Sequence, residues 1–201
     1  MTRLFRFRSL ALAAALSLTV AACDSNEPDD GDGAGEEEVI TLVRLTVTPA
    51  GGAAETYDAT FDEAGVFQSA ETMELVAGTT YGVSIDLQNT TEDPPESITA
   101  EIRDEEPEAH RFFYTPEGGV SSRITVSGLD TDPNGDPLGL TFDASVSTGG
   151  AAAGDFRVKL RHYEEDADLP EDKRNDTATA DEVPGVVEND VDFTFPVEIE
   201  D

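Results

Sequence analysis

The chain has only two histidines, and both lie beside acidic residues. His110 ends the stretch "EEPEAH" and His162 opens the stretch "HYEED". A neutral imidazole is a borderline-soft ligand that suits zinc, and a carboxylate can complete the shell or accept a hydrogen bond from a ligating histidine. The sequence therefore predicts a zinc-type site in which His110 and His162 meet, with nearby acids taken from Glu106, Glu108 and Glu164.

A simpler interpretation gives these histidines no ligand. His162 is in phase with Phe156, Val158 and Leu160, so it would face the core at the end of a strand. His110 would then be a solvated loop residue. Two histidines without a third strong ligand make a weak site, so the distance between the two imidazoles decides between the interpretations.

The segment "DTDPNGDPLGLT" has the spacing of a calcium loop, in which several oxygen atoms converge on a hard cation. The candidate ligands are Asp130, Asp132, Asn134 and Asp136. Thr141 stands where such loops usually carry a bidentate glutamate. The alternative is a hairpin turn, because the pair Asn134-Gly135 readily adopts positive φ angles.

The N-terminus has the pattern of a secretory signal. Three arginines precede an apolar run over residues 10–22, which is shorter than the ~20 residues that a membrane-spanning helix needs. The run ends in "VAAC", which resembles the lipobox of bacterial lipoproteins. That resemblance implies removal of residues 1–22 and lipidation of Cys23 with a diacylglycerol and an amide-linked acyl chain such as palmitate. The alternative is an ordinary signal with a chance cysteine, which would be unusual as a lone thiol in an exported protein.

The segment that follows Cys23 predicts a tether. Residues 24–38 contain eight carboxylates and no basic residue, so this segment cannot bury apolar area, and we expect residues 23–38 to be extended and disordered. Asp24 directly after the cysteine resembles the inner-membrane retention signal of enteric bacteria. The longer acidic run resembles the signal that sends lipoproteins of other lineages to the outer membrane and its surface, and we favour this localisation over the periplasmic face of the inner membrane.

The net charge excludes some partners. Residues 1–22 hold three of the 12 basic residues and none of the 44 acidic ones, so the remaining chain has a net charge of 9 − 44 = −35. Nucleic acid and anionic lipid surfaces repel such a chain. A composition this acidic and poor in lysine resembles that of halophilic proteins, in which salt screens the self-repulsion. The charge can therefore reflect habitat rather than function.

Residues 39–201 predict one all-β domain. Apolar and polar residues alternate in many short runs separated by Gly, Pro, Asn and Asp, which is typical of an antiparallel β-sandwich of immunoglobulin-like or jelly-roll type. The predicted strands include residues 43–47, 57–61, 81–87, 124–126, 138–146, 156–160 and 191–199. Residues 96–106 favour either a short helix or a further strand. The acidic stretch 164–190 predicts a long disordered loop, with partner binding as the alternative.

The chain resembles a group of small, functionally uncharacterised lipoproteins of Gram-negative bacteria. The resemblance rests on the acidic tether, a segment like "EEH-x-FF", a "D-x-(D/N)-G-x-P-x-G" hairpin and a strand ending "LRH"; Arg111 replaces the group's usual glutamine. It implies association with an outer-membrane uptake porter. Since no nucleophile elbow or phosphate-binding loop is present, we expect a non-catalytic, membrane-anchored module that binds a ligand or partner. The alternative is a structural or adhesive surface module stabilised by calcium.

Overall fold

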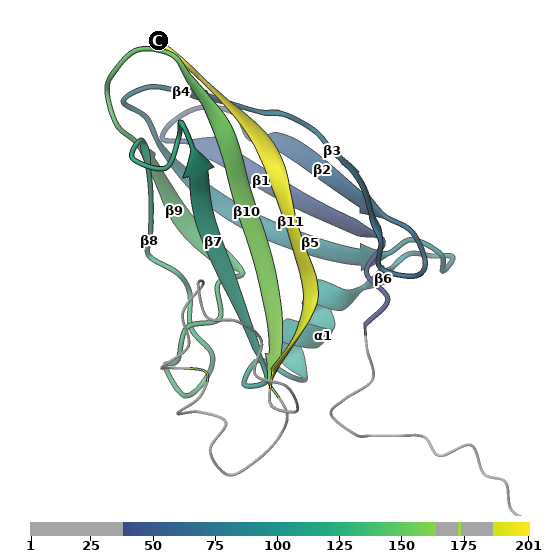
Figure 1. Ribbon diagram of the computed structural model, residues 1–201. Coiled ribbons are helices and arrows are strands. Elements are labelled where there is room, and N and C mark those ends of the chain that lie inside the picture. Colours follow the sequence, from purple (N-terminus) through teal and green to yellow (C-terminus); the bar gives the residue numbers. More distant parts are fainter. Residues whose placement is uncertain (1–37, 164–172, 174–186) are drawn as a thin grey trace, which may run out of the picture. The chain divides into compact units, whose positions relative to one another are not determined.

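The computed structural model describes residues 38–163, 173 and 187–201, which form a β-sandwich with one short helix (Figure 1). Two sheets pack face to face around a single apolar core. The predicted all-β sandwich is therefore confirmed.

The larger sheet has the strand order β3-β2-β1-β5-β9-β8, and a short strand β6 adds to one end of β5. All its paired strands are antiparallel. Its strands are β1 (Leu42–Pro49), β2 (Glu55–Phe61), β3 (Phe67–Ala70), β5 (Thr80–Asn89), β6 (Glu96–Ser97), β8 (Ile124–Ser127) and β9 (Thr141–Val146).

The smaller sheet has the strand order β4-β11-β10-β7. Its strands are β4 (Met73–Val76), β7 (His110–Gly118), β10 (Ala152–Tyr163) and β11 (Val187–Glu200). Strand β10 pairs antiparallel with both β7 and β11, whereas β4 pairs with β11 in parallel. In Figure 1 the long strands β7, β10 and β11 lie side by side in front of the larger sheet.

The alternation read from the sequence corresponds to one buried and one exposed face in most strands. In β1, Val43, Leu45 and Val47 are buried in the core. Leu138 and Leu140 are also buried, but β9 begins only at Thr141. The reason is Gly139, whose φ of +92° takes the chain out of strand conformation.

The segment that predicted either a helix or a strand is mainly helical, after the two residues of β6. Helix α1 (Ile98–Asp104) begins after Ser97, whose side chain accepts a hydrogen bond of 3.2 Å from the backbone N–H of Ala100. Ile98 and Ile102 are one turn apart on the same face, and both are buried. The N-cap and this apolar face together favour the helix. The part of the chain that the structure describes contains no helix with the length and apolar character needed to cross a membrane.

Sequence patterns missed β3, β4 and β7. The first two have four residues each and are too short to show a period. In β7 both faces carry large side chains: Phe112 faces the core, while Phe113 on the other face packs under the guanidinium groups of Arg111 and Arg161, at 4.4 and 5.3 Å from its ring centre. A strand covered on both faces loses the alternation that identifies strands.

The prediction of a disordered loop over 164–190 is wrong at its C-terminal end, because β11 already begins at Val187. Residues 164–172 and 174–186 lie outside the described residues, as do the predicted signal peptide and the tether up to residue 37.

Candidate metal centre

The two histidines face each other across neighbouring strands. His110 begins β7, His162 lies near the end of β10, and the two residues are direct partners in the antiparallel register. Their ring centroids are 4.5 Å apart. The pairs Phe112–Leu160 and Tyr114–Val158 lie next to the histidine pair on the same two strands, so the histidines continue the row of core-facing residues. The prediction that the imidazoles meet is confirmed.

A β-bulge brings Asp190 to this pair. Leu160 pairs with Val191 and Arg161 pairs with Asn189, so the register passes over Asp190. Strict alternation from the buried Val191 would turn the side chain of Asp190 outward. The extra residue of the bulge reverses this direction. As a result, Asp190 Oδ2 lies 3.8 Å from Nε2 of His110.

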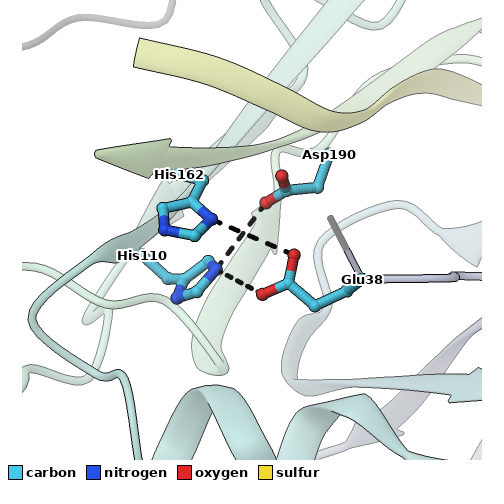
Figure 2. Close-up of side chains that lie close together, drawn as sticks. All are labelled: Glu38, His110, His162 and Asp190. Carbon is cyan, nitrogen blue, oxygen red and sulfur yellow. Dashed lines mark ion pairs between the residues drawn. The ribbon is translucent and has the colours of Figure 1, made fainter. Parts of the chain in front are cut away.

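Glu38 reaches the histidine pair from the segment that leads into the larger sheet. It lies just before β1, and its side chain points inward with only 4% of its surface exposed. Oε1 of Glu38 is 2.9 Å from Nε2 of His110, and Oε2 is 4.0 Å from Nδ1 of His162. Figure 2 shows both contacts.

These four side chains form a compact cluster of two imidazoles and two carboxylates, which we call the His/acid cluster (Glu38, His110, His162 and Asp190). One ligand atom from each residue lies within 4.8 Å of all the others. A tetrahedral zinc ion, with ligands at roughly 2.1 Å, needs separations of about 3.4 Å, so small inward side-chain movements suffice. The exposed fractions of the side chains are 0% for His110, 11% for His162, 4% for Glu38 and 7% for Asp190, so the centre is nearly closed.

The backbone carbonyl of Glu106 sets the protonation of His110. This oxygen lies 3.0 Å from Nδ1 of His110. Because a carbonyl only accepts hydrogen bonds, Nδ1 carries a proton, and in the neutral ring Nε2 has the lone pair. Metal-binding histidines are commonly oriented in this way by a carbonyl or carboxylate.

The cluster requires a cation. If His110 is neutral, the lone pair of Nε2 faces the carboxylates of Glu38 and Asp190, and three electron-rich atoms meet in a buried space. A proton on Nε2 or a metal ion relieves this repulsion. Nε2 of His110 and Oε2 of Glu38 are buried and make no aligned hydrogen bond within the described residues, which suits atoms that point toward a common ion.

The shifts in the pKa values of His110 and Glu38 also favour a positive charge in the cluster. Burial lowers the pKa of His110, but its contact with Glu38 and the charges of Glu38 and Asp190 outweigh burial, and the net pKa is raised. Burial raises the pKa of Glu38, but the contact with His110 and the charges of both histidines lower it on balance. On α1, burial and the charges of Glu38 and its neighbouring glutamates raise the pKa of Glu101.

A pocket of about 330 Å³ gives access to the carboxylate side of the cluster. Glu38 and Asp190 contribute to its wall, together with residues 63–65 of the turn that follows β2. Its lining is predominantly polar and includes the additional carboxylate of Glu63. A hydrated cation can therefore reach the cluster through an acidic entrance.

The predicted acidic ligands are only partly correct. Glu106 contributes its backbone carbonyl, and its carboxylate lies 4.0 Å from Nδ1 of His110, on the side away from the cluster. Glu108 is exposed and does not belong to the cluster, while Glu164 lies outside the described residues. The carboxylates that the structure provides are Glu38 and Asp190, which sequence reasoning missed. Both are adjacent to acidic runs, and nothing in their local sequence distinguishes them from other acids.

The predicted calcium loop is held by internal hydrogen bonds. Oδ1 of Asp132 accepts from the backbone N–H groups of Asn134 and Asp136, both at 2.9 Å. Oδ1 of Asp130 accepts from Gly139 and Thr141 at 2.9 and 3.1 Å. Gly135 has a φ of +88°, as the turn interpretation requires. The contacts favour the hairpin turn.

An internal ammonium group occupies the cation position of this hairpin. Nζ of Lys173 lies 2.7 Å from Oδ2 of Asp132 and donates a further hydrogen bond of 2.6 Å to the carbonyl of Pro107. Both charged side chains are buried, with 1% and 2% of their surfaces exposed. Burial lowers the pKa of Lys173 in spite of this partner. Calcium at Asp132 would have to displace a buried salt bridge.

The fold and the cluster define an all-β sandwich with a nearly closed two-histidine, two-carboxylate centre at one end of its core. No protein-family model matches the chain, and no curated protein and no solved structure matches it either.

Proposed function

We propose that this chain is an exported, lipid-anchored and non-catalytic binding module of the bacterial envelope, whose ligand is a divalent transition-metal ion of zinc type. The His/acid cluster is the observation that carries this proposal. Two segments far apart in the sequence, the residues before β1 and the β-bulge of β11, bring carboxylates to a cross-strand histidine pair.

Charge and ligand chemistry both favour such an ion. Two neutral imidazoles and two carboxylates carry a net charge of −2, which a divalent ion balances in this buried space. Imidazole nitrogen suits zinc, copper, nickel and iron, whereas calcium and magnesium prefer shells of oxygen. The carbonyl of Glu106 orients His110 as an outer partner orients a metal ligand.

The completeness of the shell supports binding rather than catalysis. Catalytic zinc sites usually have three protein ligands and an open position for water or substrate, whereas structural sites are closed by four ligands. The cluster offers four ligands, and His110 is fully buried. We therefore infer that the ion is held and not used to activate a substrate.

The envelope part of the proposal rests on the sequence. The signal-like residues 1–22, the lipobox-like "VAAC" and the acidic run after Cys23 support a lipid anchor, and the acidic run favours the outer membrane. An outer-membrane uptake porter is the partner that the resemblance suggests. An ion bound near the start of β1 would lie close to the expected anchor segment.

Titration calorimetry with zinc on residues 23–201 tests the metal proposal. Cys23→Ala removes the only thiol, which would otherwise be a competing ligand. We expect one site of micromolar or tighter affinity that His162→Asn and Asp190→Asn weaken strongly. Glu108→Gln is the matched control, since it removes an exposed acid next to the same turn. Weak, multiple binding that all variants retain would show that the carboxylates act as a diffuse cation sponge.

Mass spectrometry of the N-terminal peptide tests the anchor. We expect a mature chain that starts at Cys23 and carries acyl chains, and we expect Cys23→Ala to abolish the acyl mass. A mature N-terminus at another residue, without acyl mass, would contradict the lipoprotein assignment but would leave the metal centre untouched.

A further inference from the structure

From the origin of the four ligands, we infer that metal binding docks the N-terminal root of the tether onto the domain, so that Glu38 acts as a metal-dependent latch. This inference rests on the proposed metal-binding function and adds to it. Three ligands belong to the smaller sheet, on β7, β10 and β11, whereas Glu38 alone comes from the segment that leads into the larger sheet. An ion bound by all four therefore links the two sheets.

The backbone around Glu38 shows where the firmly held chain begins. Thr41 donates a hydrogen bond of 3.0 Å to Gln88 and accepts one of 2.9 Å from Phe61, so from Thr41 onward the chain is part of the larger sheet. Between Glu38 and Thr41, Ile40 is buried but Val39 is 42% exposed. Among the described residues, which begin at Glu38, the contacts of the Glu38 carboxylate with His110 and His162 are thus the most N-terminal attachment to the domain.

Among the four ligands, Glu38 is also the one best able to leave. His110 and His162 are paired across β7 and β10, and Asp190 lies in the bulge of β11 between paired residues, so the smaller sheet holds the backbone of all three. Glu38 lies before the first strand and can swing out by rotation of a few backbone bonds. When no ion is bound, Glu38 is held only by its contacts with the two imidazoles, so loss of a shared ion weakens its attachment to the domain.

Because Glu38 lies between the expected tether and the domain, its release changes how the two are connected. Glu38 is the last of the eight acids between Cys23 and the domain. When the ion is bound, the described chain is attached to the domain from Glu38 onward, next to His162 near the end of β10; when Glu38 is released, the first buried residue is Ile40. Metal occupancy thereby changes the residue at which the expected tether joins the domain.

Thermodynamic linkage makes the latch measurable. If docking of Glu38 increases zinc affinity by some factor, zinc must favour docking by the same factor. Loss of a direct ligand should weaken zinc binding at least as much as loss of an outer-shell partner, which costs about 10–100-fold. We therefore expect zinc to slow hydrogen exchange of the peptide that contains residues 38–41 by about tenfold or more.

The experiment is hydrogen exchange followed by mass spectrometry on residues 23–201 with Cys23→Ala, with and without saturating zinc, alongside calorimetry of each variant. Glu38→Gln should lower zinc affinity and abolish the zinc-dependent slowing at residues 38–41, while zinc still slows exchange around His110 and His162. Glu63→Gln is the matched control, because it removes a charge from the same pocket without removing a ligand. We expect this control to behave as the parent chain.

The outcomes separate the latch from the function on which it rests. Zinc binding that is unaffected by Glu38→Gln, or zinc binding without slower exchange at residues 38–41, would overturn the latch while the metal-binding function stands. Absence of zinc binding to the parent chain would overturn both.

Discussion

The carboxylate of Glu38 and the imidazole of His110 lie 2.9 Å apart, although one belongs to the segment before β1 and the other begins β7. This contact joins the two sheets at one end of the core. Because both side chains are almost fully buried, it is stable only when a positive charge lies between them or on the ring.

In the absence of metal, we expect this pair to make stability depend on pH. The pKa of His110 is raised above its ordinary 6.5 and the pKa of Glu38 is lowered below its ordinary 4.5. The contribution of His110 to the stability of the domain is complete below pH 6.5 and is lost as the pH rises through the folded pKa of His110. The contribution of Glu38 is complete above 4.5 and is lost as pH falls through its folded pKa.

The pair therefore stabilises the domain most between these ordinary values, and Glu38→Gln should cost about 1.5–3 kcal/mol there. The groups that face His110 are Glu38, Asp190, His162 and the backbone and carboxylate of Glu106. Urea unfolding of the parent chain and of the Glu38→Gln variant, with a chelator present and at a series of pH values, gives the difference in the free energy of unfolding. A difference that stays constant from acid to alkaline pH would contradict the pairing.

We expect zinc to raise the thermal midpoint of the domain. At a free concentration about 100 times the dissociation constant, a ligand adds about 2.7 kcal/mol, which corresponds to roughly 5–10 °C for a domain of this size. His162→Asn should abolish most of the increase, and Glu108→Gln should preserve it. Calorimetric or circular-dichroism melts with zinc and with chelator provide the measurement, and an equal increase in both variants would place the zinc elsewhere.

Calcium, in contrast, should leave the midpoint unchanged at millimolar concentration, because Lys173 already neutralises Asp132. Lys173→Met should lower the stability by about 3–5 kcal/mol, since removal of one partner leaves a buried, unpaired charge. Lys173→Arg keeps the charge and is the control. If calcium raises the midpoint of the parent chain, and Asp130→Asn with Asp132→Asn removes that increase, then the calcium-loop prediction holds and the hairpin interpretation fails.

We expect salt to stabilise the domain up to molar concentration. With a net charge of −35 after removal of residues 1–22, self-repulsion is large, and molar salt reduces the screening distance to about 3 Å. We expect the midpoint to rise with potassium chloride up to molar concentration. The comparison with an uncharged osmolyte separates screening from general exclusion effects. A flat or falling midpoint would refute the halophilic interpretation of the composition.

The sequence by itself determined the fold class and the two histidines of the His/acid cluster. Alternation with a period of two follows directly from burial of one face of a sheet, so runs such as Val43 to Val47 predict strands without knowledge of their partners. The same phase correctly placed His162 in line with Leu160 on the inner face. The four-residue spacing of Ile98 and Ile102 was compatible with a helix, but a strand remained open, and the structure decided for the helix.

Only the tertiary structure decided which acids join the histidines. The chain has 44 acidic residues, so the local sequence cannot single out Glu38 or Asp190. Glu38 is brought in by packing of the larger sheet on the smaller one, which is a long-range contact. Asp190 points inward because the register between β10 and β11 shifts by one residue, and a pattern of alternation predicts the opposite direction.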